Sequence, residues 1–255
     1  MDAPWKLRLL GGWRLFRGGT PVELTPSPQR LVALLALTGR PSRGYVAGVL
    51  WPDEPESYGR NNLRALLSRL RQRSFGGLIH HGDTGLALED DVAVDVDDLR
   101  RCVAALHSDG ATGVDRGELI GLLTAGELLP GWYDDWVLGE RERLRQAQLH
   151  TVELLCDIWS AEGDQAAALD AALLAVRLDP LRESAHRRAV AVHLEEGNVA
   201  EALRQFHRYE RLLDDELHIS PTEQMRDLVA PFLGSGHGNA GVTVRSRHAT
   251  HSGGY

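Results

Sequence analysis

The sequence lacks the features of secreted and membrane-spanning proteins. No apolar run approaches the roughly 18 residues that a membrane-spanning helix needs, and hydrophobic residues make up 43% of the chain. A secretion signal would place a basic segment and an apolar stretch near the start, whereas residues 1–4 lead directly into amphipathic sequence. We therefore expect a soluble, cytoplasmic protein without a membrane partner.

Cysteine is also scarce. The chain has only two cysteines, Cys102 and Cys156, and each lies among apolar residues at helical spacing. Cysteines in such surroundings are usually small buried side chains. The sequence thus predicts free thiols in a reducing compartment and excludes a disulfide framework.

Catalytic motifs are missing as well. The sequence contains no glycine-rich phosphate loop, no closely spaced pair of zinc ligands and no nucleophile elbow. The glycine-rich run at 234–238 has neither a predicted strand nor a predicted helix beside it, so we interpret it as part of a flexible tail. We predict no enzymatic activity, no cofactor and no metal site.

Charge is present but unevenly distributed. The formal net charge of −8 argues against a nucleic-acid partner, because phosphate binding needs cations. Residues 1–88, however, contain 12 lysines and arginines against 6 acids, whereas the remainder contains 16 against 30. A basic first third and an acidic remainder are typical of a protein in which one domain meets DNA and the other does not.

The N-terminal region has the predicted elements of a winged helix. Short apolar runs bounded by glycine-rich turns predict small strands before and after a helical segment. The predicted strands lie at 5–10, 13–16, 22–24, 78–81 and 86–88. Ser27 followed by Pro28 marks the start of a first helix.

Two further helices are predicted before the last pair of strands. Ser42 caps a short helix, which proline ends. The residues of this helix that we expect to face inward are Tyr45, Val46, Val49 and Leu50. The third helix extends from about Ser57 to Phe75. A sheet, three helices and a hairpin in this order predict a winged helix-turn-helix.

From residue 95 to 233 the hydrophobic spacing is helical. The segment that begins with Glu162-Gly163 recurs at Glu196-Gly197, an offset of 34 residues, which is the tetratricopeptide period. The predicted fold is mainly α, with an N-terminal winged helix-turn-helix containing small β-sheets and an all-α tetratricopeptide-like helical repeat domain. We place the domains at 1–94 and 95–233 and expect a disordered tail at 234–255.

The third predicted helix carries the strongest functional signal. Its leucines gather on one side at about 100° per residue, and its other side combines arginines, asparagines and small residues. Five arginines and no acid lie between Ser57 and Phe75. Arginine can give two hydrogen bonds to guanine, and asparagine two to adenine. We predict a recognition helix, because an ordinary solvated face would carry acids at i,i+4 spacing.

Further DNA contacts are expected from the hairpin and the second helix. The candidate DNA-binding residues are Arg43, Arg60, Asn61, Asn62, Arg64, Ser68, Arg69, Arg71, Arg73, His81 and Thr84. Alternatives stay open outside the third helix. His81 and Thr84 could form only a polar hairpin tip, and Arg43 could be solvated instead of binding a phosphate at its helix N-terminus.

Several motifs resemble the Streptomyces antibiotic regulatory proteins, which join an OmpR-type winged helix to a bacterial transcriptional activator domain. The motifs occupy residues 50–55 (LWPDEP), 67–71 (LSRLR), 126–136 (GELLPGWYDDW), 177–186 (RLDPLRESAH) and 196–206 (EGNVAEALRQF). The resemblance covers about residues 5–233. It would make residues 95–233 the bacterial transcriptional activator domain.

The resemblance implies an activator of a secondary-metabolite biosynthetic gene cluster. Such a protein would bind promoter direct repeats as a homodimer and recruit RNA polymerase through its sigma subunit. The implied polymerase contacts, in the loop between the second and third helices, are Trp51, Asp53, Glu54 and Glu56. The sequence departs from the family at 84–88, which lacks a Gly-Tyr pair. We expect the small, two-domain form of the family, without an ATPase or sensor domain after the repeats.

Two other functions stay open. A tetratricopeptide-like protein-interaction scaffold would use the repeats for docking, and a ligand-sensing regulator would hold a small molecule between its helices. We interpret Trp132, Tyr133 and Trp136 as a packed aromatic corner and not as a ligand site. The arginine-rich helix favours DNA binding, because a scaffold does not need a face without acids.

Overall fold

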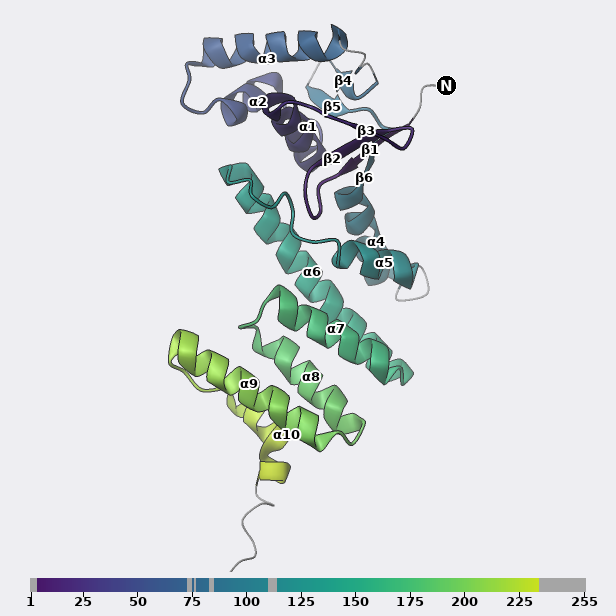
Figure 1. Ribbon diagram of the computed structural model, residues 1–255, viewed down its shortest axis with the longest axis vertical. Coiled ribbons are helices and arrows are strands. Elements are labelled where there is room, and N and C mark those ends of the chain that lie inside the picture. Colours follow the sequence, from purple (N-terminus) through teal and green to yellow (C-terminus); the bar gives the residue numbers. More distant parts are fainter. Residues whose placement is uncertain (1–3, 73–74, 76, 83–84, 110–113, 234–255) are drawn as a thin grey trace, which may run out of the picture. The chain divides into compact units, whose positions relative to one another are not determined.

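The computed structural model describes residues 4–72, 75, 77–82, 85–109 and 114–233. Contacts divide the chain into two compact units, Met1–Ile158 and Trp159–Tyr255. The fold is mainly α, with small N-terminal sheets and a helical repeat region, as the sequence predicts (Figure 1). Arg73, Thr84 and the tail at 234–255 lie outside the described residues. The domain boundary at 94/95 stays a prediction.

The winged helix begins with a four-stranded sheet in the order β3-β2-β1-β6. The strands are β1 (Trp5–Arg8), β2 (Arg14–Arg17), β3 (Thr20–Val22) and β6 (Ala93–Val94). The first three form an antiparallel meander, whereas β6 returns from far along the chain to pair parallel with β1. Buried Trp5, Leu7 and Leu15 line the inner face of the sheet. The domain core therefore starts on this face.

Three helices and a hairpin complete the winged helix. They are α1 (Pro26–Thr38), α2 (Arg43–Leu50), α3 (Glu56–Gln72), β4 (Ile79–His81) and β5 (Leu86–Leu88). Ser42 caps α2 as predicted, because its side chain accepts a hydrogen bond from the Tyr45 amide at 3.2 Å. The predicted start of α1 at Ser27 is wrong, because Thr25 is the N-cap and the helix begins at Pro26. The prediction that Tyr45 faces inward is wrong: its side chain is 50% exposed. Val46, Ala47 and Leu50 form the buried side, and Tyr45 lies well away from it around the helix.

Three helices follow β6 in the first unit. They are α4 (Asp95–Asp109), α5 (Arg116–Leu123) and α6 (Asp135–Glu162), of which α6 continues past Ile158. Cys102 in α4 and Cys156 in α6 are buried and belong to no disulfide, which confirms the interpretation of the two thiols as packing residues. Burial raises the pKa of the Cys102 thiol.

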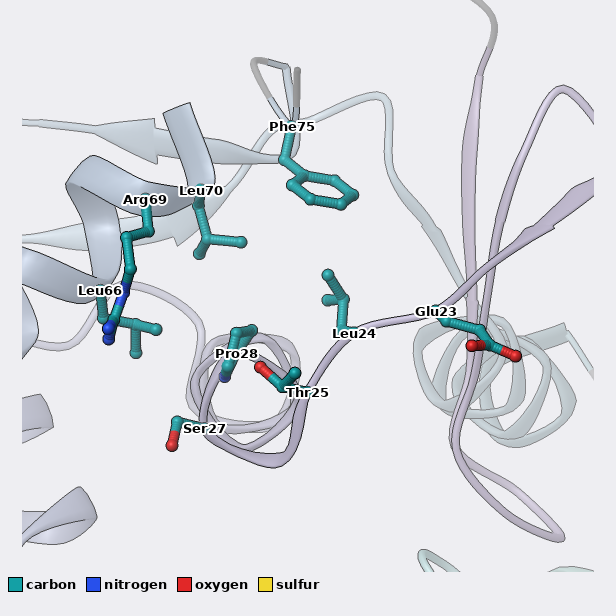
Figure 2. A pocket seen from close by; sticks show the side chains of 9 residues that line it. All are labelled: Glu23, Leu24, Thr25, Ser27, Pro28, Leu66, Arg69, Leu70 and Phe75. Atoms are coloured by element: carbon teal, nitrogen blue, oxygen red, sulfur yellow. The ribbon is translucent and has the colours of Figure 1, made fainter. Parts of the chain in front are cut away.

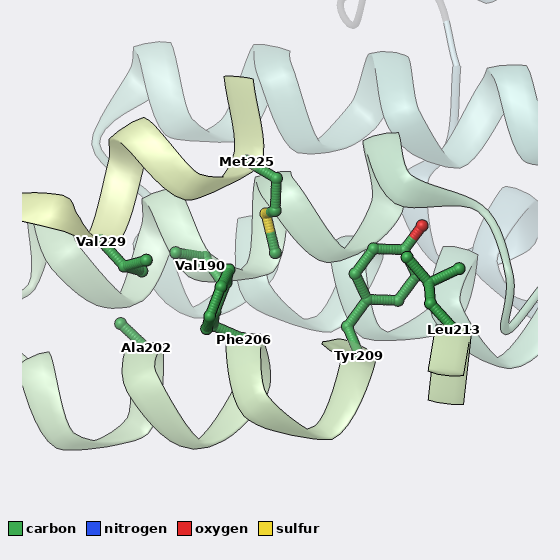
Figure 3. Packing of buried hydrophobic residues seen from close by; sticks show 7 residues of the cluster. All are labelled: Val190, Ala202, Phe206, Tyr209, Leu213, Met225 and Val229. Atoms are coloured by element: carbon green, nitrogen blue, oxygen red, sulfur yellow. The ribbon is translucent and has the colours of Figure 1, made fainter. Parts of the chain in front are cut away.

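The second unit is built from antiparallel helices. They are α7 (Gln165–Leu178), α8 (Glu183–Glu195), α9 (Val199–Leu217) and α10 (Glu223–Leu233). Gly163 and Gly197 precede α7 and α9 with φ of +81° and +77°, a conformation that favours glycine, and the starts of these helices repeat the predicted 34-residue offset. A buried cluster joins α8, α9 and α10 (Figure 3). Its members are Val190, Ala202, Phe206, Tyr209, Leu213, Met225 and Val229.

Candidate nucleic-acid interface

The leucine side of α3 anchors the helix. Leu63, Leu66, Leu67 and Leu70 are 5% exposed or less, as their spacing predicts. Gly59 faces α2 so closely that a Cβ there would lie 3.3 Å from a backbone oxygen of α2. Packing therefore fixes which side of α3 remains in solvent.

The opposite side of α3 is exposed. The predicted contacts that lie there in solvent are Arg60, Asn61, Arg64, Ser68, Arg69 and Arg71. Asn62 is half-buried at the edge, and Ala65 is exposed between the longer side chains. The structure thus brings the described candidates of this helix onto one surface. The small side chains at 65 and 68 leave the helix backbone approachable.

The helix begins one residue earlier than expected, at Glu56. The Glu56 carboxylate pairs with the Arg60 guanidinium one turn later. Both side chains are more than half exposed, so the pair contributes only about 0–1 kcal/mol. The expectation of an arginine helix without an i,i+4 acid is therefore wrong for its first turn, because the helix includes a residue that the sequence assigned to the loop.

Arg64 and Arg69 differ in their surroundings. Nη1 of Arg64 donates to Oδ1 of Asn61 at 3.3 Å, so these two side chains meet near the middle of the exposed face. Arg69 instead points along a hollow of about 440 Å³ toward Ser27, in the first turn of α1 (Figure 2). Apolar side chains, among them Phe75, line this hollow. Arg69 can reach a DNA groove only if it swings away from α1.

The wing contacts the end of α3 through Arg71. Nε of Arg71 donates to Nε2 of His81, the last residue of β4, at 3.3 Å. Burial, and then the nearby charges of Arg71 and Arg43, lower the pKa of His81 from its usual 6.5. A neutral imidazole that accepts at Nε2 carries its proton on Nδ1, which is buried without a partner among the described residues. Arg71 therefore supplies the positive charge at this position, and His81 does not.

Gly85 joins the base of the wing to the connection between α1 and α2. A Cβ at Gly85 would lie 2.5 Å from the Pro41 carbonyl oxygen, and the Leu86 amide donates to the same oxygen at 3.1 Å. Only glycine permits so close an approach. Arg43 is exposed in the first turn of α2, near enough to His81 to affect its pKa. The wing, the start of α2 and the end of α3 thus form one basic surface.

The loop between α2 and α3 presents two unpaired carboxylates. Asp53 and Glu54 are exposed, and neither has an ion-pair partner in the described part of the chain. Glu56, predicted to share their role, instead lies in α3 and pairs with Arg60. Trp51 is half-buried and ends α2. Of the four implied polymerase contacts, Asp53 and Glu54 are exposed and unpaired, whereas Glu56 is exposed but paired with Arg60.

Arg30 of α1, which the sequence does not single out, fixes the start of this loop. Its Nη1 donates to the Leu50 carbonyl at 3.1 Å, and its Nη2 donates to the Asp134 carboxylate. One guanidinium thus ties the end of α2 to the segment before α6. No local pattern marks such an arginine, because its partners lie 20 and 104 residues away.

The segment at 126–136, which we call the clamp segment, packs on the first turn of the sheet. The Gly11 amide donates to the Glu127 carbonyl at 2.8 Å, and the Leu129 amide donates to the Leu9 carbonyl at 2.9 Å. These bonds extend the sheet turn with backbone from far along the chain. The winged helix and the clamp segment therefore share one hydrogen-bond network.

Two further segments contact the turn after β1. The Asp95 carboxylate, at the start of α4, accepts hydrogen bonds from the amides of Leu9 and Leu10 at 3.0 Å. Burial raises the pKa of Asp95, although these bonds oppose the shift. A Cβ on Gly11 would lie 2.4 Å from the Ala125 carbonyl oxygen. The backbones meet with no room for a side chain.

The Arg141 side chain, on α6, binds the main chain of the clamp segment. Its guanidinium donates to the carbonyls of Leu128, Leu129 and Trp132 at 2.7–3.0 Å. The side chain is only 16% exposed. An arginine with three carbonyl acceptors stabilises this backbone and has few donors left for another molecule.

The predicted aromatic corner is present but differs in composition. Trp132 packs against Trp136, with ring centroids 6.5 Å apart, and Trp13 of the sheet turn stacks on Trp132 at 6.2 Å. Tyr133 is 78% exposed and takes no part in this packing. The corner thus links the clamp segment to the winged helix through a tryptophan that the sequence did not associate with it.

The described residues offer neither a membrane span nor a metal cluster. No helix among them is both long and apolar enough to cross a bilayer. No group of three or more histidines, cysteines and acids in that part of the chain could hold a metal ion.

Comparisons with known proteins place the chain among bacterial regulators. The family model of the bacterial transcriptional activator domain matches residues 87–233. Regulatory protein AfsR is 29% identical over 236 residues in Streptomyces coelicolor and 27% identical over 247 residues in Streptomyces griseus. These alignments cover 88% and 89% of this chain but 24% of each relative. The chain therefore spans about a quarter of the length of these relatives.

A solved structure shares the fold. The chain is similar to Mycobacterium tuberculosis EmbR in complex with a low affinity phosphopeptide, with a TM-score of 0.66 and 20% identity. The match covers 91% of this chain and 65% of the EmbR chain. The predicted resemblance to the Streptomyces antibiotic regulatory proteins is confirmed, and the relatives are regulatory proteins, not enzymes. The chain belongs to the family of transcription regulators that carry the bacterial transcriptional activator domain.

Proposed function

We propose that the protein is a sequence-specific, DNA-binding transcription activator of a secondary-metabolite biosynthetic gene cluster. It acts in the cytoplasm, where it binds promoter direct repeats as a homodimer. The exposed side of α3 reads the DNA, and the loop between α2 and α3 contacts the sigma subunit of RNA polymerase.

The observation that carries this proposal is the exposed side of α3. Asn61, Arg64 and Ser68 offer hydrogen-bond donors and acceptors of the kind that read base edges in the major groove. Arg71 and Arg43 lie beside this face, where cations neutralise phosphates. The buried leucines hold the backbone in place, so the side chains are presented in a defined orientation.

A mobility shift on the protein's own promoter region, repeated across a salt series, tests DNA binding. Each phosphate contact releases counterions, so log K should fall against log salt with a slope of about −0.9 per contact. A second promoter region of similar length, from a housekeeping gene, serves as the control DNA. The absence of a salt-dependent shift that favours the first DNA would contradict the proposal.

Three substitutions separate base reading from phosphate binding. Arg64→Ala should cost about 1–3 kcal/mol of discrimination between the two DNAs. Arg71→Ala should weaken binding to both alike and reduce the salt slope by about one. Arg69→Ala should also lose selectivity if the side chain leaves α1 on binding, whereas Arg143→Ala, in an exposed part of α6, should change neither quantity. Unchanged selectivity in Arg64→Ala would remove α3 as the reading element.

The polymerase contact is tested with the loop carboxylates. Asp53→Asn combined with Glu54→Gln removes two unpaired charges and retains the side-chain shapes. We expect unchanged promoter affinity and a severalfold loss of transcription in a reconstituted reaction, because a basic sigma surface would lose its partners. Undiminished transcription at full promoter occupancy would show that this loop does not recruit polymerase through these carboxylates.

A further inference from the structure

A second cationic surface lies on the outer face of the four-stranded sheet. The strand register puts Lys6 opposite Phe16 and Arg8 opposite Arg14. Leu7, between the first two cations, is fully buried, so its neighbours in the strand point to the other face. We call Lys6, Arg8 and Arg14 the sheet cations.

The sheet cations lack close acidic partners, although Arg8 is near enough to Asp95 to oppose the rise in the pKa of that carboxyl group. None of them forms an ion pair with any described residue. The Arg8 guanidinium lies over the Phe16 ring, 5.8 Å from its centroid. A hollow of about 510 Å³ adjoins Arg14 and is lined largely by apolar side chains, including Trp13 and Pro21, with Glu23 as its one acidic lining residue. Arginine beside aromatic and apolar surface is characteristic of protein interfaces.

This surface lies on β1 and β2, whereas α3 carries the predicted DNA-reading face (Figure 1). The two surfaces are neighbours, because Glu23 and Leu24 line both the hollow beside the sheet and the hollow that Arg69 enters. The aromatic and apolar surroundings of the sheet cations suit a protein partner with complementary charge.

The end of α9 has the complementary chemistry. Asp214, Asp215 and Glu216 are exposed in its last turn, which contains no basic residue. None of the three forms an ion pair within the described chain. Acids at this position are unfavourable because the helix dipole is negative there. Leu217 and Ile219 beside them are 48% and 53% exposed.

We propose that the sheet cations of one copy bind these three acids, the α9 acids, of a second copy. Leu217 and Ile219 of the second copy would then cover the apolar hollow beside the sheet. Two sheet faces would repel each other, as would two α9 ends, so the contact joins two different faces. Residues 159–233 carry 8 arginines against 14 acids, which adds attraction at longer range.

When one face of each copy binds a different face of the next copy, the contact can repeat along a row of copies that all have the same orientation. It suits neighbouring binding sites of the same orientation, and in that respect it deepens the proposed binding of direct repeats as a homodimer. Its physical basis, however, is the pair of surfaces alone. Because each surface is small, we expect weak association that depends on concentration and salt.

Charge reversal on each face tests the proposal in the full chain. The sheet variant combines Lys6→Glu with Arg14→Glu, and the helix variant combines Asp214→Arg with Asp215→Arg. Sedimentation velocity without DNA, at low salt and across a concentration series, measures self-association. Arg143→Glu is the control, and circular dichroism verifies folding. Lys6→Gln with Arg14→Gln replaces the sheet variant if that variant does not fold.

We expect the parent to self-associate and each variant alone to raise the dissociation constant by about tenfold or more. An equal mixture of the two variants should associate as the parent does, because each reversed face then meets an opposite charge. The control should behave as the parent. A monomeric parent, variants that associate unchanged, or a mixture that fails to restore association would each overturn the proposal.

A separate measurement distinguishes nucleic acid as the occupant of the sheet. The sheet variant and the parent are compared for binding to a mixed-sequence duplex, at protein concentrations where both are monomeric. Equal affinity is expected. Weaker binding by the sheet variant would show that the sheet cations meet DNA and would overturn the proposal. Self-association is measured without DNA, so its failure leaves DNA binding by α3 a separate question.

Discussion

Arginines serve opposite purposes in two regions of the first unit. On α3, the Arg64 and Arg69 side chains are exposed to solvent and donate to no backbone carbonyl among the described residues. Around the clamp segment, Arg30 is half-buried and Arg141 largely buried, and both donate to backbone carbonyls. The same side chain thus presents free donors in one region and stabilises main chain in the other. An arginine count does not distinguish the two uses, whereas burial and the identity of the acceptor do.

The two regions also differ in what a substitution should change. Loss of an arginine around the clamp segment leaves carbonyls without donors, and such groups are costly when buried. Loss of an arginine on α3 leaves solvent in its place. The first kind of change should therefore appear in stability and the second in binding.

The largest effect is expected from Arg141→Gln. The substitution removes three charge-assisted hydrogen bonds, so we expect the free energy of unfolding to fall by about 3–5 kcal/mol. Urea unfolding followed by tryptophan fluorescence measures it. Arg143→Gln, two residues along α6 and 78% exposed, should stay within about 0.5 kcal/mol of the parent. Similar values for the two variants would remove the distinction between the two uses of arginine.

Gly11→Ala should have the next largest effect. Gly11 has φ of +71°, and an added Cβ would meet the Ala125 carbonyl oxygen. Gly19→Ala is the matched control, since Gly19 has φ of +84° but open space around it. We expect a loss of about 3 kcal/mol at Gly11 and about 1 kcal/mol at Gly19, where only backbone strain acts. Equal losses in urea unfolding would show that the turn can move away from the clamp segment.

On α3 the effect on stability should be close to zero. Arg64→Ala should leave the free energy of unfolding within about 0.5 kcal/mol of the parent, although we expect it to reduce discrimination between promoters. The same urea experiment measures it beside the mobility shift. A large loss of stability would mean that the Arg64 contact with Asn61 serves the fold, contrary to the comparison drawn above.

The smallest effect concerns pH at the border of the α3 surface. The pKa of His81 is lowered in the folded protein, so as pH falls below 6.5 the unfolded chain takes up this proton first. The stability contributed by neutral His81 is therefore present above pH 6.5 and is lost as pH falls toward the folded pKa. The effect should be small because the side chain is only partly buried.

Nuclear magnetic resonance can follow the His81 ring through this titration. Arg71→Ala should raise the pKa of His81 toward 6.5, because the substitution removes the nearer cationic influence, and Arg43→Ala should raise it less. A pKa that stays the same in Arg71→Ala would show that the charge of Arg71 does not contribute to the shift.

The sequence predicts what depends on local periodicity. Leucine spacing gave the buried side of α3 correctly, and the 34-residue offset gave the helix pairs of the second unit. Boundaries were less certain, because one extra residue at the start of α3 brought Glu56 opposite Arg60. Tyr45 was misplaced because a short helix leaves several apolar residues to choose between.

Long-range contacts are beyond such a prediction. The partners of Arg30 and Arg141 are backbone carbonyls or a distant carboxylate, and a carbonyl leaves no mark in a sequence. The stacking of Trp13 on Trp132 likewise joins segments that share no local pattern. The exposed side chains of α3 could be predicted because they all lie on one helix. The contact between the clamp segment and the turn after β1 could not, because it joins two segments far apart in the sequence.

The closing of the sheet turn has a consequence for the order of folding. The Asp95 carboxylate reaches the Leu9 amide across 86 residues, and Glu127 supplies the acceptor for Gly11. During synthesis the first strand leaves the ribosome long before these partners exist. Contacts between residues so far apart in the sequence are slow to form. We therefore expect the helices to form before the turn after β1 makes its long-range hydrogen bonds. We also expect β1 to pair with β2 early, and the turn after β1 to be completed only once Asp95 and Glu127 are in place.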